Sequence, residues 1–142
     1  MKYISVGFLA VLISFLPQRA LAQNSSLKQL EMLLNDPAYS ANRCLQAVGP
    51  LLSHGEMVAW SEELYRLHRK SLNALEMAKE ASARHEREEA ALFARRAIDL
   101  FNSRMYRQRE LAALARERAE KIKKKERRKV WDSFFEGYPT TT

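Results

Sequence analysis

The side chains best suited to chemistry gather near the C-terminus, where a basic segment is followed by aromatic residues. Between Lys121 and Lys129, seven of the nine residues are basic and one is acidic. Like charges four residues apart on a helix repel each other by roughly 0.2–0.5 kcal/mol per pair. This segment therefore destabilises its own helix slightly, and an anionic partner would relieve the repulsion. The apolar side chains that follow are spaced to lie on one helical face: Val130, Trp131, Phe134, Phe135 and Tyr138.

The predicted binding residues for a partner or an anionic surface are Lys121, Lys123, Lys124, Lys125, Arg127, Arg128, Lys129, Trp131, Phe134 and Phe135. Three uses of this segment fit the pattern. It folds back over the N-terminal helices, it docks into a groove of a partner protein as an amphipathic helix, or it lies on an anionic membrane surface. For the basic residues alone, a plain solvated helix face is the alternative. Nucleic acid is not the expected partner, because no RNP-like sequence, zinc-finger spacing or basic leucine-zipper pattern is present.

Cys44 is the only cysteine in the chain. Leu45, Val48 and Leu51 surround it at helical spacings, which favours a buried thiol that behaves as a small apolar residue. In an oxidising compartment, a single cysteine is also a candidate for an intermolecular disulfide with a second copy or another protein.

Signals for catalysis are weak. His85 and Glu89 lie one helical turn apart, but a metal site needs a third and a fourth ligand from elsewhere. The chain has no HExxH motif, no nucleophile elbow and no glycine-rich phosphate loop. We therefore expect a protein that is not an enzyme and that carries no metal or cofactor.

The first 22 residues have the three-part layout of a secretory signal peptide. A positive start at Lys2 is followed by an uncharged apolar run from Ile4 to Leu16, and Ala20 and Ala22 provide small residues before a cleavage site. We expect cleavage after Ala22 and export of the mature chain to a bacterial periplasm. The apolar run is shorter than the roughly 20 residues that a membrane-spanning helix needs.

The composition of the mature chain predicts an all-α fold. Residues 56–136 contain neither glycine nor proline, and helix-forming residues dominate. Two short helices are expected in residues 23–55, one from Leu27 to Leu34 with Ser26 as its cap, and one capped by Ser40 that ends near Val48. A turn at residues 53–55 then precedes a long helical tract over 56–136, and residues 137–142 are expected to be disordered.

Two apolar seams with three- and four-residue spacing run along the long tract. The first contains Met57, Trp60, Leu64, Leu67, Ser71, Ala74, Ala78 and Ala81. The second contains Ile98, Phe101, Met105, Gln108, Ala112, Ala115, Ala119 and Ile122. A charged stretch at residues 84–89 separates them, so the tract either bends there or at residues 102–103 into a helical hairpin, or it forms an elongated coiled coil that pairs with a second copy.

These observations predict a non-enzymatic protein and leave two classes of function open. The first is an adaptor or structural subunit of an envelope assembly of the secretion, conjugation or pilus type, docking through the basic and aromatic end. The second is a free periplasmic chaperone that holds acidic or unfolded clients. An aromatic end concentrated in one short segment favours the adaptor, because a chaperone would spread its apolar surface along the helices.

Overall fold

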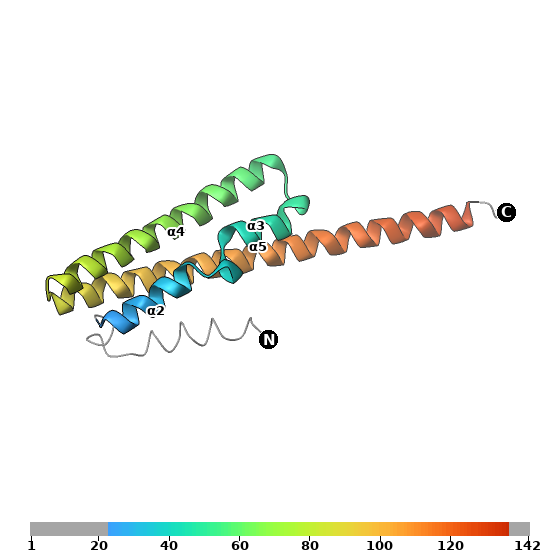
Figure 1. Cartoon of the computed structure of the whole chain (residues 1–142). Coiled ribbons are helices and arrows are strands. Elements are labelled where there is room, and N and C mark those ends of the chain that lie inside the picture. The colour runs from blue at the N-terminus through green and yellow to red at the C-terminus, as the bar shows by residue number, and fades with distance from the viewer. Residues whose placement is uncertain (1–22, 137–142) are drawn as a thin grey trace.

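The computed structural model describes residues 23–136, and it contains four α-helices and two short 3₁₀ helices within them (Figure 1). No β-strand occurs in this described part of the chain, so the all-α prediction is confirmed. The predicted signal peptide at residues 1–22, the predicted disordered tail at residues 137–142 and the aromatic residue Tyr138 lie outside the described residues.

The N-terminal segment forms two short helices, α2 (Asn24–Leu34) and α3 (Ala41–Val48), each followed by a 3₁₀ turn, η2 (Pro37–Tyr39) and η3 (Gly49–Leu51). Ser40 caps α3 as predicted, because its Oγ accepts a hydrogen bond from the backbone N–H of Arg43 at 3.1 Å. The prediction for Ser26 is wrong. Helix α2 begins at Asn24, three residues before the predicted start at Leu27, so Ser26 lies inside the helix.

Helix α4 (His54–Ala83) begins with a reciprocal cap. The Ser53 Oγ accepts from the N–H of Glu56 at 3.2 Å, and the Glu56 carboxylate accepts from the N–H of Ser53 at 2.9 Å. Residues 53–55 were predicted to form a turn, but Ser53 alone is the cap, and His54 and Gly55 already belong to the helix. The long tract therefore begins two residues before the predicted start.

A tight turn at Arg84, His85 and Glu86 ends α4. The N–H of Glu86 donates to the carbonyl of Ala81 and the N–H of His85 to that of Ser82, the pair of bonds that defines a Schellman motif. His85 has φ of 62°, the left-handed conformation that usually belongs to glycine at this position. The chain thus reverses within the charged stretch at residues 84–89.

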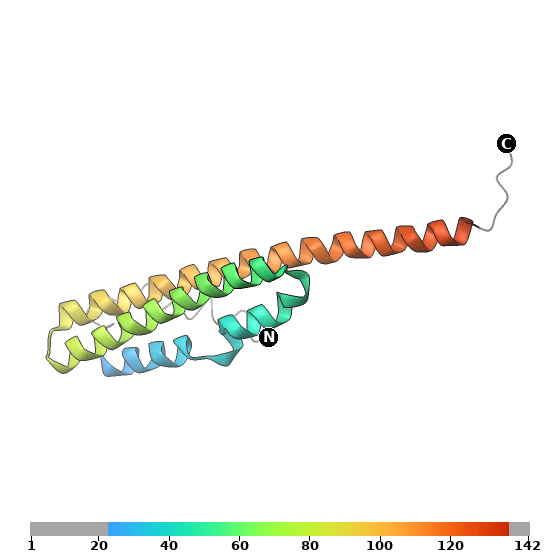
Figure 2. The same cartoon turned by 90° about the horizontal axis from the view of Figure 1, so that it is seen from above.

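Helix α5 (Arg87–Phe135) follows the turn and runs for 49 residues without interruption. Residues 102–103, the other candidate break point, stay within it, and Ser103 donates its hydroxyl to the carbonyl of Asp99 at 2.9 Å. Helix α4 lies antiparallel to the first part of α5, and α2 and α3 lie along this pair (Figures 1 and 2).

Two clusters of buried side chains hold these helices together. The cluster nearer the turn joins leucines of α2 to small residues of α4 and α5, with Leu75, Ile98 and Phe101 as its largest members from the long helices. The second cluster joins α3 to the start of α4 and the middle of α5 through Leu45, Leu64 and Leu111. Both predicted seams contribute to these clusters. The buried face of α5 begins earlier than predicted, with four alanines that bring α5 close to α4: Ala90, Ala91, Ala94 and Ala97.

Burial ends abruptly along α5. Ala115 is buried and Ala119 is half-buried, but every residue from Glu120 to Glu136 is exposed. The second seam was predicted to reach Ile122, yet this side chain is 48% exposed because α4 begins too late in the chain to cover it. We call residues 24–118 the body and residues 120–135 the arm. Within residues 23–136, no helix is both long enough and apolar enough to cross a membrane.

Candidate functional site: the C-terminal arm

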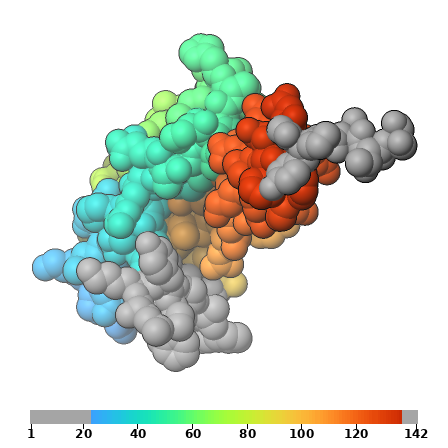
Figure 3. Space-filling view, turned by 90° about the vertical axis from the view of Figure 1, so that its right-hand side faces the viewer, coloured from blue at the N-terminus to red at the C-terminus, as the bar shows by residue number. Residues whose placement is uncertain are grey.

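The arm is a continuation of α5 that projects beyond the body. Two perpendicular views show no other described element beside it (Figures 1 and 2). Seen from the arm's end, α3 and the start of α4 lie to one side of α5 (Figure 3). At about 1.5 Å per residue, the 16 residues of the arm carry the helix about 24 Å past the body. The body nucleates this helix, so the arm adds turns without the usual nucleation cost.

Arg118 marks the base of the arm. Its guanidinium donates to the carbonyl of Leu51 at 3.1 Å and forms two bonds with the Glu56 carboxylate at 2.7 and 2.5 Å. Hydrogen bonds from Arg118 and from the backbone of Ser53 lower the pKa of Glu56 to about 2. One carboxylate therefore both caps α4 and ties its first turn to the last buried turn of α5.

The basic residues of the arm lack such partners. Among the described residues, Lys121 pairs with Glu117 at 3.6 Å, and the other six basic residues of this segment have no carboxylate within 4.0 Å. In the body, by contrast, Arg107 binds Glu63 at 2.6 Å and packs over the ring of Trp60 at 4.6 Å. The predicted repulsive segment is thus a helix whose charge is left uncompensated.

The end of the arm carries an aromatic cluster that we call the tip: Trp131, Phe134 and Phe135. The Trp131 ring stacks on Phe135 at 5.3 Å between centroids, and Phe134 meets both rings edge to face at 6.2 and 5.3 Å. The three side chains nevertheless remain 55–59% exposed. Such preferred ring geometry gives the tip a defined apolar surface before any partner arrives.

The structure brings all ten predicted binding residues together on the arm, and it does not show the tip folded back over the N-terminal helices. Helices α2 and α3 use their apolar side chains on α4 and the body part of α5 instead. The groove-docking and membrane-surface interpretations remain as uses of the arm. Comparisons with protein-family models, with curated proteins and with solved structures find no match to this chain.

Cys44 lies half-buried between α3 and α5. Its thiol donates to the carbonyl of Gln108 with a sulfur–oxygen distance of 3.9 Å, and burial raises its pKa. It lines a surface groove of about 320 Å³ together with residues that include Arg43, Gln108 and Arg109. The packing resembles that of a small apolar residue, and an intermolecular disulfide would first have to bring the thiol out of this groove.

Arg104, which no pattern in the sequence singles out, is only 1% exposed in the middle of α5. Its Nη1 donates to the carbonyl of Tyr39 and to the Gln108 side chain, both at 2.7 Å, while its buried Nε has no partner. No carboxylate of residues 23–136 is bonded to Arg104, and burial lowers its pKa. It links η2 to α5, which is a structural role.

His85 and Glu89, the pair with metal-like spacing in the sequence, lie at the turn without a third candidate ligand in reach of both among the described residues. Glu89 instead shares a hydrogen bond with Glu86, which raises the pKa of Glu89. His85 lines a polar hollow of about 520 Å³ with Lys79 and Arg87. Within residues 23–136, no three His, Cys, Asp or Glu side chains gather closely enough to hold a metal ion.

Proposed function

We propose that this protein is a non-enzymatic, exported helical adaptor or structural subunit of a bacterial envelope assembly of the secretion, conjugation or pilus type. The body serves as its scaffold, and the arm docks onto a protein partner in the envelope. The observation that carries this proposal is the arm itself, in which uncompensated basic residues and a defined aromatic tip are held clear of the body on a continuous helix.

The distribution of exposed apolar side chains supports an adaptor over a chaperone. On the body, the exposed apolar residues are isolated from one another in sequence, as with Met32, Val58 and Leu92. At the tip, Val130 and the three aromatic residues are exposed within six positions of one another. A protein that holds unfolded clients would need a broad apolar surface, whereas one compact epitope suits a defined partner.

The test is a pull-down of the tagged mature protein from intact envelopes, beside a truncation that lacks residues 130–142. A few stoichiometric partners that disappear with the truncation are expected for an adaptor. The matched control replaces two apolar residues of the body, Met32→Ser and Leu92→Ser, which are as exposed as the tip residues. This control should retain the partners. A broad set of substoichiometric proteins that survives the truncation would instead establish the chaperone function.

A further inference from the structure

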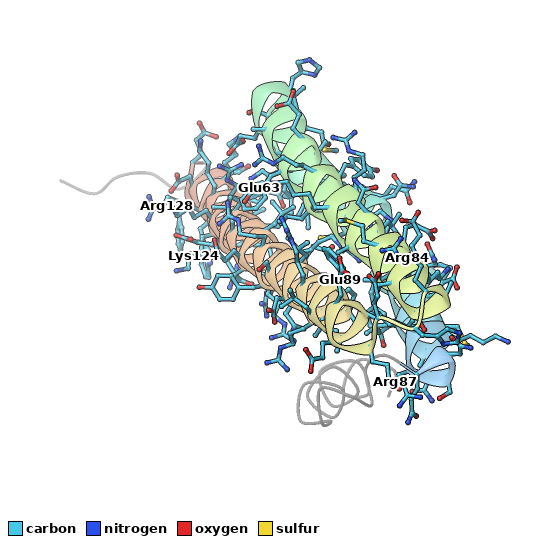
Figure 4. The ribbon with its side chains drawn as sticks, turned by 90° about the vertical axis from the view of Figure 1, so that its left-hand side faces the viewer. Glu63, Arg84, Arg87, Glu89, Lys124 and Arg128 are labelled. Atoms are coloured by element: carbon cyan, nitrogen blue, oxygen red, sulfur yellow. The ribbon has the colours of Figure 1, made fainter. Side chains whose placement is uncertain are left out.

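One face of the arm combines its charge and its aromatic residues. Positions separated by three or four residues lie on the same side of a helix. This spacing connects a series of exposed residues that we call the stripe: Lys121, Lys124, Arg128, Trp131 and Phe135. Its three basic residues span about 10 Å along the axis, and the stacked pair Trp131 and Phe135 follows directly. Figure 4 shows Lys124 and Arg128 on the side of α5 away from α4.

The stripe lies opposite the face that α5 uses inside the body. The body seam continues into the arm at Ile122, and Trp131 follows nine residues later. At about 100° per residue, nine residues place these two side chains on opposite sides of the helix. The stripe is therefore a separate surface and not an unfilled extension of the contact between α4 and α5.

Charge argues against a second copy of this chain as the occupant of the stripe. Two arms laid side by side would oppose two segments that each hold seven basic residues and one acidic residue at positions 121–129. Like charges facing each other across an interface are strongly unfavourable.

The order of residues along the stripe argues against a bilayer. A helix that lies on a membrane has an apolar face along its length, with basic residues on the polar face. On the arm, Lys124 and Arg128 occupy the same face as Trp131, so a flat orientation that buries the rings would also turn these two charges toward the hydrocarbon.

We propose that the stripe binds an acidic protein surface in which carboxylates lead into an apolar pocket. The carboxylates would pair with Lys124 and Arg128, and the pocket would take Trp131 and Phe135. This inference rests on the proposed function and names the chemistry of the partner. Basic residues next to an exposed aromatic anchor match such a surface because the rings supply the buried area while the charges set orientation and register.

Two double variants of the arm test whether binding depends on the side of the helix that carries the stripe. Lys124→Glu with Arg128→Glu reverses two charges on the stripe. Lys123→Glu with Lys129→Glu reverses two charges of the same segment, and neither residue lies three or four positions from a residue of the stripe. Both double variants have the same net charge, and all four substituted residues are exposed. Circular dichroism should show the same helix content and unfolding midpoint for both.

The readout is photo-crosslinking in the cell that exports the protein, with p-benzoylphenylalanine at position 134 of the full chain. Trp131 and Phe135 stay intact in this design. A discrete protein adduct is expected. The stripe variant should reduce it by about tenfold or more, the size of effect expected for paired interfacial charges, and the control variant should change it by less than about twofold. The crosslinked segment of the partner should carry net negative charge.

Equal losses from the two variants would overturn the proposal, because they would indicate a diffuse anionic surface that ignores the face of the helix. Binding of the wild-type chain to vesicles of phosphatidylglycerol and phosphatidylethanolamine, without a protein adduct in the cell, would assign the arm to a membrane and also overturn it. The proposed function fails separately, when truncation of residues 130–142 leaves the pulled-down partners unchanged.

Discussion

The body and the arm share one helix, and they differ in what surrounds it. In the body, α5 buries a row of small and apolar residues against α4, and three of its arginines bond to carboxylates or carbonyls: Arg104, Arg107 and Arg118. In the arm, the same helix continues with every residue exposed. Helix formation therefore does not distinguish the two regions, because the composition of both favours a helix. The difference lies in burial, because the side chains of the arm are exposed and therefore accessible to a partner.

The two regions also differ in how arginine is used. Arg118 donates its hydrogen bonds to Glu56 and Leu51 within the chain. Arg127 and Arg128 follow nine and ten residues later and have no such contacts among the described residues. The boundary coincides with the first turn of α4, where the cover for α5 ends. The position at which α4 begins thus decides which arginines of α5 bond within the body and which stay exposed on the arm.

The largest contrast is expected from truncating one buried and one exposed side chain. Leu75 is 1% exposed, and Leu75→Ala should destabilise the protein by about 2–5 kcal/mol through lost burial and a cavity. Trp131 is 59% exposed, and Trp131→Ala should change the free energy of unfolding by less than about 0.5 kcal/mol. Chemical denaturation followed by circular dichroism measures both. A loss of stability in the Trp131 variant comparable to that of Leu75→Ala would mean that the tip packs on the body.

A smaller change in stability is expected at Arg104, where two substitutions distinguish the contribution of side-chain volume from that of charge. Arg104→Ala leaves a cavity between η2 and α5, and we expect a loss of about 3 kcal/mol. Arg104→Met fills most of that volume and removes a buried charge that no carboxylate compensates, so its cost should be less than half as large. Unfolding midpoints in urea compare the two. Equal destabilisation would show that the hydrogen bond to Tyr39 outweighs packing.

The turn of the body contains a site where stability should rise. His85 adopts a left-handed conformation that costs a non-glycine residue roughly 1–2 kcal/mol, so His85→Gly should stabilise the body by about 1 kcal/mol after the entropic cost of glycine is counted. Ala113→Gly, at an exposed position inside α5, is the matched control and should destabilise the protein by about the same amount. Thermal unfolding distinguishes the two directions.

The smallest expected effect concerns acid and the base of the arm. Glu56 has a pKa of about 2 in the folded protein, against an ordinary value of 4.5. Since the folded state holds the deprotonated form, its contribution is complete above pH 4.5 and is lost as the pH falls toward 2. The Glu56→Gln variant should show a smaller fall in unfolding midpoint across this window than the wild type. An identical pH dependence in both would place the acid sensitivity elsewhere, for example at Glu63, whose pKa Arg107 also lowers.

Much of the architecture follows from local patterns in the sequence. The spacing of Leu64, Ala74 and Ala78 identifies the buried face of α4, and Ser40 identifies the start of α3. The ten residues proposed for binding could be picked out from the sequence, because charge and aromatic character are properties of the residues themselves. What these patterns did not give was whether the arm folds back, since this depends on how much of α5 the other helices cover.

Arg104 and the early alanines show where local patterns fail. An arginine within a helical seam is normally taken as a surface residue, and its burial here depends on a carbonyl supplied by Tyr39, 65 positions earlier in the chain. The alanines from Ala90 to Ala97 follow the same three- and four-residue spacing as the seam, but their weak hydrophobicity was hidden by the neighbouring charges. Small side chains at these positions allow α5 to pack closely on α4. This advantage cannot be recognised until the position of α4 is known.

The three-residue link between α4 and α5 also has a consequence for how the chain reaches this structure. The two longest helices are neighbours in sequence, so most of their contact forms by closing a short connection, and contacts of this local kind allow helical proteins to fold in microseconds to milliseconds. The later docking of α2 must close a loop of roughly forty or more residues, a slower step because of its larger entropy. We therefore expect the antiparallel pair to form first, the N-terminal helices to dock onto it, and the arm to add turns to the α5 helix that the pair has nucleated.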